Sequence, residues 1–193
     1  MAKRILTIFV ILMLVSGCTV SKITNNNDKK SDSENDLADK SLLNVTVTIP
    51  AKWFSESDTE ITQDYLDKEV NEKGYISATL NSDGSVTYVM SKSKHNELLE
   101  SIKDEINKSI KELIDDDSNS IIDIQINDDM TEFRVTLNNN SVTLVESFAT
   151  LAFDVYGGMY NIFAGKVADN IKTIFQNQSG ETIEEYNSSD SNK

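Results

Sequence analysis

The amino-acid sequence predicts an α+β fold, in which an antiparallel sheet built from hairpins carries helices on one face. Short segments of alternating apolar and polar residues occur in pairs around turn dipeptides, and each such pair predicts a β-hairpin. Longer segments with apolar residues at helical spacing lie between the pairs. The resulting order is β-α-ββ-α-ββ-α-ββ. The alternation within the strands indicates that one sheet face is covered and the other meets water.

The first strand and the first helix are marked by the residues at their ends. Residues 42–50 read LLNVTVTIP, in which every second residue is apolar until Pro50 stops the strand. A helix is predicted over 62–74, because Thr62 can cap its first turn and Gly74 is a typical C-terminal signal.

The rest of the chain alternates between hairpins and helices. In chain order we expect a hairpin, a long amphipathic helix, a second hairpin, an apolar helix and a third hairpin, at residues 75–90, 91–117, 121–137, about 142–164 and 170–186. Asp83-Gly84 and Ser179-Gly180 supply two of the hairpin turns. In the second hairpin we expect three isoleucines to share one face opposite three apolar residues of the partner strand: Ile122, Ile124 and Ile126 with Phe133, Val135 and Leu137.

The charge of the chain excludes some classes of partner. The 193 residues carry a formal net charge of −14, and the pI is about 4.4. Such a chain has no basic surface to displace counterions from nucleic acid, which excludes nucleic acid as a partner. The acidity also disfavours adhesion to anionic lipid, and its main expected effect is solubility. The length suffices for one α+β domain, which we place at 42–186.

The N-terminus has the pattern of an export signal. Residues 1–17 combine a short basic start, an apolar run too short to span a membrane and small residues before Cys18. The string VSGC, which ends in Gly17 and Cys18, resembles the lipobox of bacterial lipoproteins. In that family the cysteine thiol receives a diacylglycerol, and the peptidase cuts between the two residues. The alternative is an ordinary secretory signal, but it leaves the only cysteine of the chain unexplained.

A diacylglyceryl-Cys18 would anchor the chain on the extracytoplasmic face of the cell membrane. Loss of the two basic residues of the signal would lower the formal net charge from −14 to −16. Residues 18–41 are polar and lack an apolar period, so we expect the lipidated cysteine and a flexible tether spanning on the order of 25–30 Å. The tail at 187–193 is expected to be disordered.

Four strings within the predicted domain resemble a family of small lipoproteins of Gram-positive bacteria. They are VTVTIPAKWF, EKGYISATLNSDGSVTYVMS, MTEFRVTL and AFDVYGGMYNIFAG, and the resemblance would cover about residues 42–186. It implies the localisation and a single domain. It implies no activity and no catalytic residues.

The residues needed for several kinds of enzyme are missing from the sequence. His95 is the only histidine and Cys18 is expected to be acylated, which excludes a histidine-based triad and a multi-histidine metal site. We therefore expect a non-enzymatic binding or interaction domain without a cofactor, whose partner is another envelope protein or a wall polymer. The alternative is a carboxylate-dependent hydrolase acting on a cell-wall or surface glycan.

The acidic segment after the long helix raises the question of calcium. Asp115, Asp117 and Asn119 have the one-three-five spacing of an EF-hand loop, but Ser120 replaces its glycine and Ile126 its final glutamate. A solvated acidic connection is the simpler interpretation, and we predict no metal site. The three residues stay weak calcium candidates.

Two aromatic residues follow the first strand. Trp53 and Phe54 could form a contact patch for a partner, or they could plug the end of the core. We favour the plug, because large aromatic side chains are usually buried to a large extent.

The apolar helix contains two adjacent glycines that need an explanation. Gly157 and Gly158 each cost about 1 kcal/mol relative to alanine in a helix interior. We expect this helix to be the centre of the core, with the glycines allowing close packing against the sheet or another helix. The alternative is a ligand groove floored by bare backbone, with Tyr156 and Tyr160 at its rim.

Overall fold

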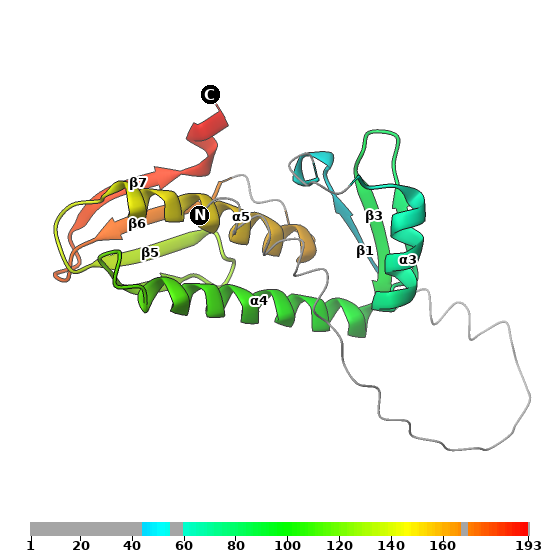
Figure 1. Cartoon of the computed structure of the whole chain (residues 1–193), viewed down its shortest axis with the longest axis horizontal. Helices are drawn as coiled ribbons and strands as arrows, with labels where there is room; N and C mark the ends of the chain where they lie inside the picture. The colour runs from blue at the N-terminus through cyan, green and yellow to red at the C-terminus, as the bar shows by residue number, and fades with distance from the viewer. Residues whose placement is uncertain (1–43, 55–59, 167–169, 193) are drawn as a thin grey trace, which may run out of the picture. The chain divides into compact units, whose positions relative to one another are not determined.

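The computed structural model describes residues 44–54, 60–166 and 170–192 and confirms an α+β fold (Figure 1). From the sequence we placed one domain at residues 42–186. The chain forms two compact units, of which the first ends at Glu97 and the second begins at Leu98. Each unit has its own sheet, so the strands do not form the one continuous sheet that we expected. Hairpin signals specify the pairing within each hairpin, but they do not say which hairpins share a sheet.

The first unit is built on a three-stranded antiparallel sheet in the order β1-β3-β2. Its strands are β1 (Asn44–Ile49), β2 (Ser77–Leu80) and β3 (Val86–Ser91), and η1 (Ala51–Trp53) follows β1. Helix α3 (Gln63–Lys73) packs on the sheet and places Leu66 in the core.

The ends of α3 are those that the sequence predicts. The Thr62 hydroxyl accepts a hydrogen bond from the Tyr65 amide at 3.2 Å. At the other end Gly74 adopts the left-handed conformation, with φ of 72°, and its amide donates to the Val70 carbonyl.

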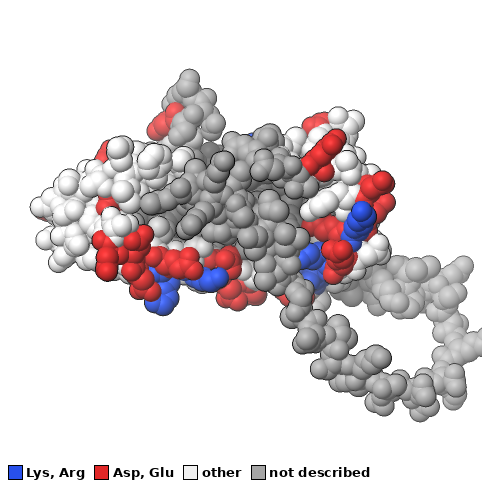
Figure 2. Space-filling view, viewed as in Figure 1, with Lys and Arg blue, Asp and Glu red and all other residues white. Residues whose placement is uncertain are grey.

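Helix α4 (Lys92–Ile114) begins at the cap predicted for it, because the Ser91 hydroxyl accepts from the Lys94 amide at 3.2 Å. One face of α4 is buried through Ile102, Ile106 and Ile110. The opposite face carries carboxylates with lysines between them, several in i,i+3 pairs (Figure 2).

The second unit contains a four-stranded mixed sheet in the order β4-β5-β6-β7. The strands are β4 (Ile121–Ile126), β5 (Glu132–Leu137), β6 (Lys172–Gln176) and β7 (Thr182–Asn187). The predicted hairpins are present, but β5 and β6 pair in parallel, whereas we expected only antiparallel pairs. The parallel pair arises because helix α5 (Leu144–Phe163) connects the two strands and returns the chain to the end of the sheet at which β5 began (Figure 1).

The core of the second unit lies between its sheet and helices α4 and α5. The Phe133 ring stacks on the Phe153 ring of α5, with centroids 4.7 Å apart. Val135, Leu137 and Phe175 are also fully buried. The three alternating residues of β5 thus face the core, as predicted.

The opposing isoleucines of β4 do not all share one face. A β-bulge interrupts the register between Ile121 and Asp123, which leaves Ile122 exposed while Ile121 and Ile124 are buried. A bulge inserts one unpaired residue and reverses the alternation on one side of it. This is why the uniform pattern predicted for this strand is wrong at Ile122.

The tail is ordered for longer than expected. Asn187 ends β7, and Ser188–Asn192 form a short 3₁₀ helix, η2, where we predicted disorder from residue 187. The Ser188 amide donates to the Ile171 carbonyl at 2.9 Å, and its hydroxyl accepts from the Ile171 amide at 2.8 Å. These bonds extend the pairing of β6 with β7 by one more residue pair, Ile171 with Ser188.

A buried hydroxyl in β6 gives a first testable prediction. Thr173 is fully buried, and its Oγ1 has no hydrogen-bond partner among the described residues. Burying an unpaired hydroxyl costs about 1–3 kcal/mol, so Thr173→Val should stabilise the second unit by about 1 kcal/mol. Urea unfolding of both chains measures the change, and a less stable variant would contradict the prediction.

The predicted signal, the lipid-attachment residue Cys18 and the tether lie outside the described residues. Within the described ranges, no helix has the length and apolar character required to cross a bilayer.

Candidate functional site: the polar face of the four-stranded sheet

The alternation along β5 creates two different faces of the second sheet. Phe133, Val135 and Leu137 are buried in the core, so the residues between them project from the opposite face. The strand register places their polar neighbours from β4, β6 and β7 on the same face. We call this set the polar face, and its members are Asp123, Gln125, Glu132, Arg134, Thr136, Lys172, Gln176 and Glu185.

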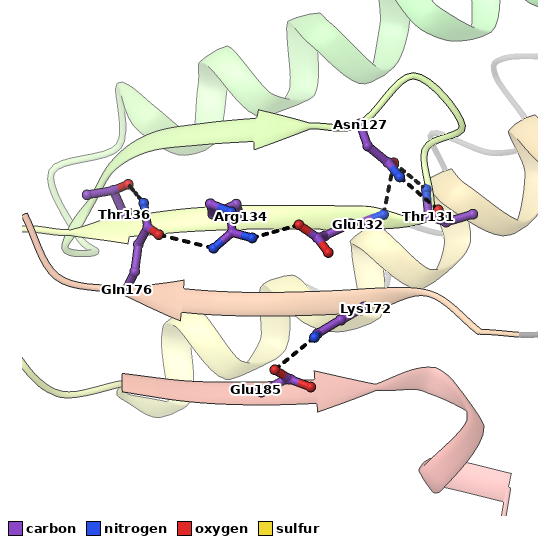
Figure 3. Close-up of polar contacts among 8 residues, drawn as sticks. All are labelled: Asn127, Thr131, Glu132, Arg134, Thr136, Lys172, Gln176 and Glu185. Carbon is purple, nitrogen blue, oxygen red and sulfur yellow. Dashed lines mark hydrogen bonds and ion pairs between the residues drawn. The ribbon is translucent and has the colours of Figure 1, made fainter. Parts of the chain in front are cut away.

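Arg134 lies in the middle of the polar face and is the only arginine of the chain besides Arg4. Its guanidinium donates to Glu132 Oε1 at 2.8 Å and to Gln176 Oε1 at 3.4 Å (Figure 3). The Gln176 amide in turn donates to Thr136 Oγ1 at 3.0 Å. A chain of hydrogen bonds therefore joins β5 to β6 and holds the guanidinium in one orientation.

A second ion pair extends the polar face to the edge of the sheet. Lys172 Nζ lies 2.9 Å from Glu185 Oε2, which links β6 to β7 (Figure 3). Between the two ion pairs lies Ile174, whose register neighbours are Arg134 and Glu185. Ile174 is buried although it is on this face, because the aliphatic parts of long charged neighbours can cover it.

The turn that leads into β5 is also held by side-chain bonds. Asn127 Oδ1 accepts from the amides of Thr131 and Glu132 at 2.8 and 3.0 Å, and its Nδ2 donates to Thr131 Oγ1 at 2.9 Å (Figure 3). These bonds fix the end of the strand that carries Glu132. The polar face is thus a preorganised surface with both donors and acceptors, and each of its two cations is paired with a carboxylate.

The glycine pair lies at a different place, in α5. A Cβ atom on Gly157 would lie 2.4 Å from the Met130 carbonyl oxygen and 2.7 Å from Ile171 Cδ1. Close packing therefore explains Gly157, while Gly158 is half-buried.

The two tyrosines beside the glycines face α4. The Tyr156 hydroxyl lies near Ser109, which offsets part of the rise that burial causes in the pKa of Tyr156, and Lys103 Nζ lies 5.7 Å from the centre of the Tyr160 ring. Both tyrosines therefore contribute to the packing of α5 against α4.

Two of the three calcium candidates bond to neighbouring residues. Asp115 pairs with Lys111 at 2.6 Å, and Asn119 Oδ1 accepts from the Ile121 amide at 2.8 Å. Asp117 is exposed. In the part of the chain that the structure describes, no three or more His, Cys, Asp or Glu residues are grouped to hold a metal ion.

The remaining candidates lie in the first unit. Trp53 and Phe54 are both half-buried, which is intermediate between the plug and the contact patch that we considered. Lys52 Nζ lies 5.9 Å from the centre of the Trp53 ring. His95, in the first turn of α4, is also half-buried.

Sequence reasoning did not anticipate a buried carboxylate in the first unit. Glu69 projects from α3 into the core and accepts a hydrogen bond from the Tyr88 hydroxyl at 2.9 Å. Burial raises the pKa of Glu69, and the bond from Tyr88 and the charge of Lys73 offset part of this effect. Burial beside the same carboxylate raises the pKa of Tyr88.

The raised pKa of Glu69 makes the stability of the first unit depend on pH. Because the folded state raises the pKa of Glu69, its contribution to stability is full below the unfolded value of about 4.5 and is lost as the pH rises through the folded value. Glu69→Gln keeps an acceptor for Tyr88 without the buried charge, so it should increase amide-exchange protection of α3 and β3 at pH 7 but not at pH 4. Equal effects at both pH values would contradict the assignment.

No protein-family model, curated protein or solved structure matches this chain.

Proposed function

We propose that this protein is a lipoprotein held by diacylglyceryl-Cys18 on the extracytoplasmic face of the cell membrane. The support is the order of features in residues 1–18: a basic start, an apolar run, small residues and then the only cysteine. Two acyl chains suffice for stable anchoring, whereas one does not. The charge-rich tether would let the domain reach partners near the membrane.

We further propose that it is a non-enzymatic interaction module whose partner is another envelope protein or a wall polymer. The observation that carries this proposal is the polar face, on which hydrogen bonds fix the donors and acceptors around Arg134 before any partner arrives. Preorganised polar groups lose little entropy on binding. A guanidinium in a fixed orientation is suited to planar acceptors such as carboxylates or phosphates.

The anchor is tested by Cys18→Ala. Without the thiol no diacylglycerol can be attached, so the chain should leave the detergent phase and stay uncut by the lipoprotein-specific peptidase. Fractionation with detergent phase separation and the size of the chain on a gel measure both effects. If the variant still enters the detergent phase at its normal size, the anchor is elsewhere.

The polar face is tested by Arg134→Gln in cross-linking pull-downs from intact cells. The lipidated chain should capture a reproducible partner or wall fragment, and the variant should lose most of it. Lys111→Gln is the matched control, because it also removes one cation from an ion pair of the second unit, away from the polar face. Equal capture by all three chains would exclude the polar face as the binding surface.

A hydrolase acting on a cell-wall or surface glycan stays as the alternative, because Glu132 and Glu185 lie on one sheet face. It predicts that the chain releases reducing sugars from purified walls and that Glu132→Gln or Glu185→Gln stops the release. An interaction module predicts binding to the walls without release.

A further inference from the structure

Helix α5 exposes large apolar side chains that are not part of the core. We call Leu144, Val145, Phe148 and Leu151 the α5 patch, and these residues are 77%, 42%, 63% and 56% exposed. We expected contacts with the core on several sides of α5. Ala149, Phe153 and Met159 are buried on different sides of the helix, whereas the four side chains of the patch lie in its first turns and are exposed. Together the four side chains expose on the order of 450 Å², which is the size of the largest apolar patch on a typical monomer, and such patches often bind a partner.

The patch is rigidly placed at the start of the helix. Thr143 and Glu146 form a capping box, and the Glu146 carboxylate also accepts from the amide and hydroxyl of Ser120 at 2.8 and 2.6 Å. Leu144, Phe148 and Leu151 follow one another at intervals of four and three residues. This is the spacing with which one helix packs against another.

The patch is also free of charge in a strongly acidic chain. Between Arg134 and Asp154 the sequence contains one ionisable residue, Glu146, and that residue is buried. The surface over the first turns of α5 is accordingly white in Figure 2. A contact made by these four side chains therefore involves no exposed charge of α5 in its first two turns, and the nearby carboxylate of β7, Glu184, is hydrogen-bonded by Tyr186.

These features favour a second copy of the chain over a lipid surface. Helices that lie in a membrane interface carry Lys or Arg beside their apolar stripe, whereas α5 contains neither. Two copies of an acidic chain repel each other wherever carboxylates meet, so a charge-free patch is where they can approach. Two patches would bury on the order of 900 Å² in total, which is below a standard interface and corresponds to a weak dimer.

We propose that two copies of this protein associate through the α5 patch, with α5 against α5 about a two-fold axis. Each patch then supplies the apolar cover that the other lacks, and the same residues contribute from both sides. The contact is weak in solution, with dissociation on the order of 100 μM. Copies anchored in one membrane are concentrated in a thin layer, which favours the dimer. That last step rests on the proposed anchor, but association in solution does not.

Sedimentation equilibrium of the mature chain carrying Cys18→Ser tests the dimer without the lipid. We expect monomers at about 5 μM and a majority of dimers near 500 μM, as mass action requires at this affinity. Phe148→Asp should stay monomeric throughout. Ile76→Asp is the control, since it places the same charge at another exposed apolar residue and should leave the dimer intact. Amide exchange confirms that both variants are folded. A monomeric parent chain at 500 μM overturns the proposal.

A second measurement identifies the surface through which the two copies contact each other. In the Cys18→Ser chain, Phe148→Cys places the only thiol on the patch, and a short bis-maleimide should join two copies far faster than it joins Lys111→Cys chains. Equal rates overturn the α5 contact. Flotation of the Cys18→Ser chain with phosphatidylglycerol–phosphatidylcholine vesicles, abolished by Phe148→Asp, would assign the patch to lipid instead. These results leave the anchor untouched, because no acyl chain is present.

Discussion

Gly157→Ala is expected to destabilise the second unit by about 2–3 kcal/mol, although alanine is the better helix former. The new methyl group would lie 2.4 Å from the Met130 carbonyl oxygen, which belongs to the backbone and cannot swing away as a side chain can. The turn between β4 and β5, which contains Met130, is also fixed to α5, because Asn161 Nδ2 donates to the Asp129 carbonyl at 2.8 Å. Overpacking against this turn outweighs the gain of about 1 kcal/mol in helix propensity.

Denaturant unfolding measures this loss, and Thr150→Ala is the control. Thr150 is half-buried in the same helix, so the control changes helix propensity without the clash. Ile171→Val removes the Cδ1 atom at 2.7 Å and should rescue Gly157→Ala only in part, because the carbonyl oxygen remains. A Gly157→Ala chain as stable as the parent would show that Gly157 and the Met130 carbonyl oxygen are not in close contact in solution.

Acid is expected to destabilise the second unit through Glu146. This carboxylate is 1% exposed and accepts hydrogen bonds from the amides and hydroxyls of Ser120 and Thr143. Burial alone would raise the pKa of Glu146, but the four donors outweigh it and lower the pKa to about 2. Because the folded value is below the unfolded value of about 4.5, the stabilisation is present above pH 4.5 and is lost as the pH falls through 2. It corresponds to about 3 kcal/mol.

Glu146→Gln separates this contribution from general acid effects. The amide turns one acceptor oxygen into a donor that faces other donors, so the variant should lose about 2–4 kcal/mol at pH 7. Its unfolding free energy should also vary less between pH 4.5 and 2 than that of the parent. Glu100→Gln, at an exposed position on α4, is the control and should keep the parent's pH dependence. An unchanged slope in Glu146→Gln would assign the acid sensitivity to other groups.

The predictions that succeeded rest on interactions between residues close in sequence. Thr62 and Gly74 delimit α3 through bonds within one turn, and Gly84 adopts the positive φ that its hairpin requires. Both the capping signals and the turn dipeptide act over a few residues, so they can be read without the fold. The close packing expected for the glycine pair is present at Gly157, although its contacts, Met130 and Ile171, could not be named from the sequence.

The errors share a cause as well. The parallel pairing of β5 with β6 depends on the end of the sheet at which α5 returns the chain. The exposure of Ile122 depends on a β-bulge, which the strand propensities of the residues do not reveal. From the apolar character of α5 we expected core contacts on several sides, but the pattern of apolar residues does not show that the first turns expose part of them. Its exposed Phe148 became apparent only in the folded unit.

The sequence by itself determined the α+β class, the succession of elements and the acidic charge, and it also carries the whole basis for the proposed anchor at Cys18. The division into two units, the polar face around Arg134 and the buried role of Glu146 were decided only by the tertiary structure. Arg134 meets Gln176 across 42 residues, and Glu146 meets Ser120 across 26. Such contacts depend on strand register and helix placement, which burial of the whole core selects and which no short stretch of residues encodes.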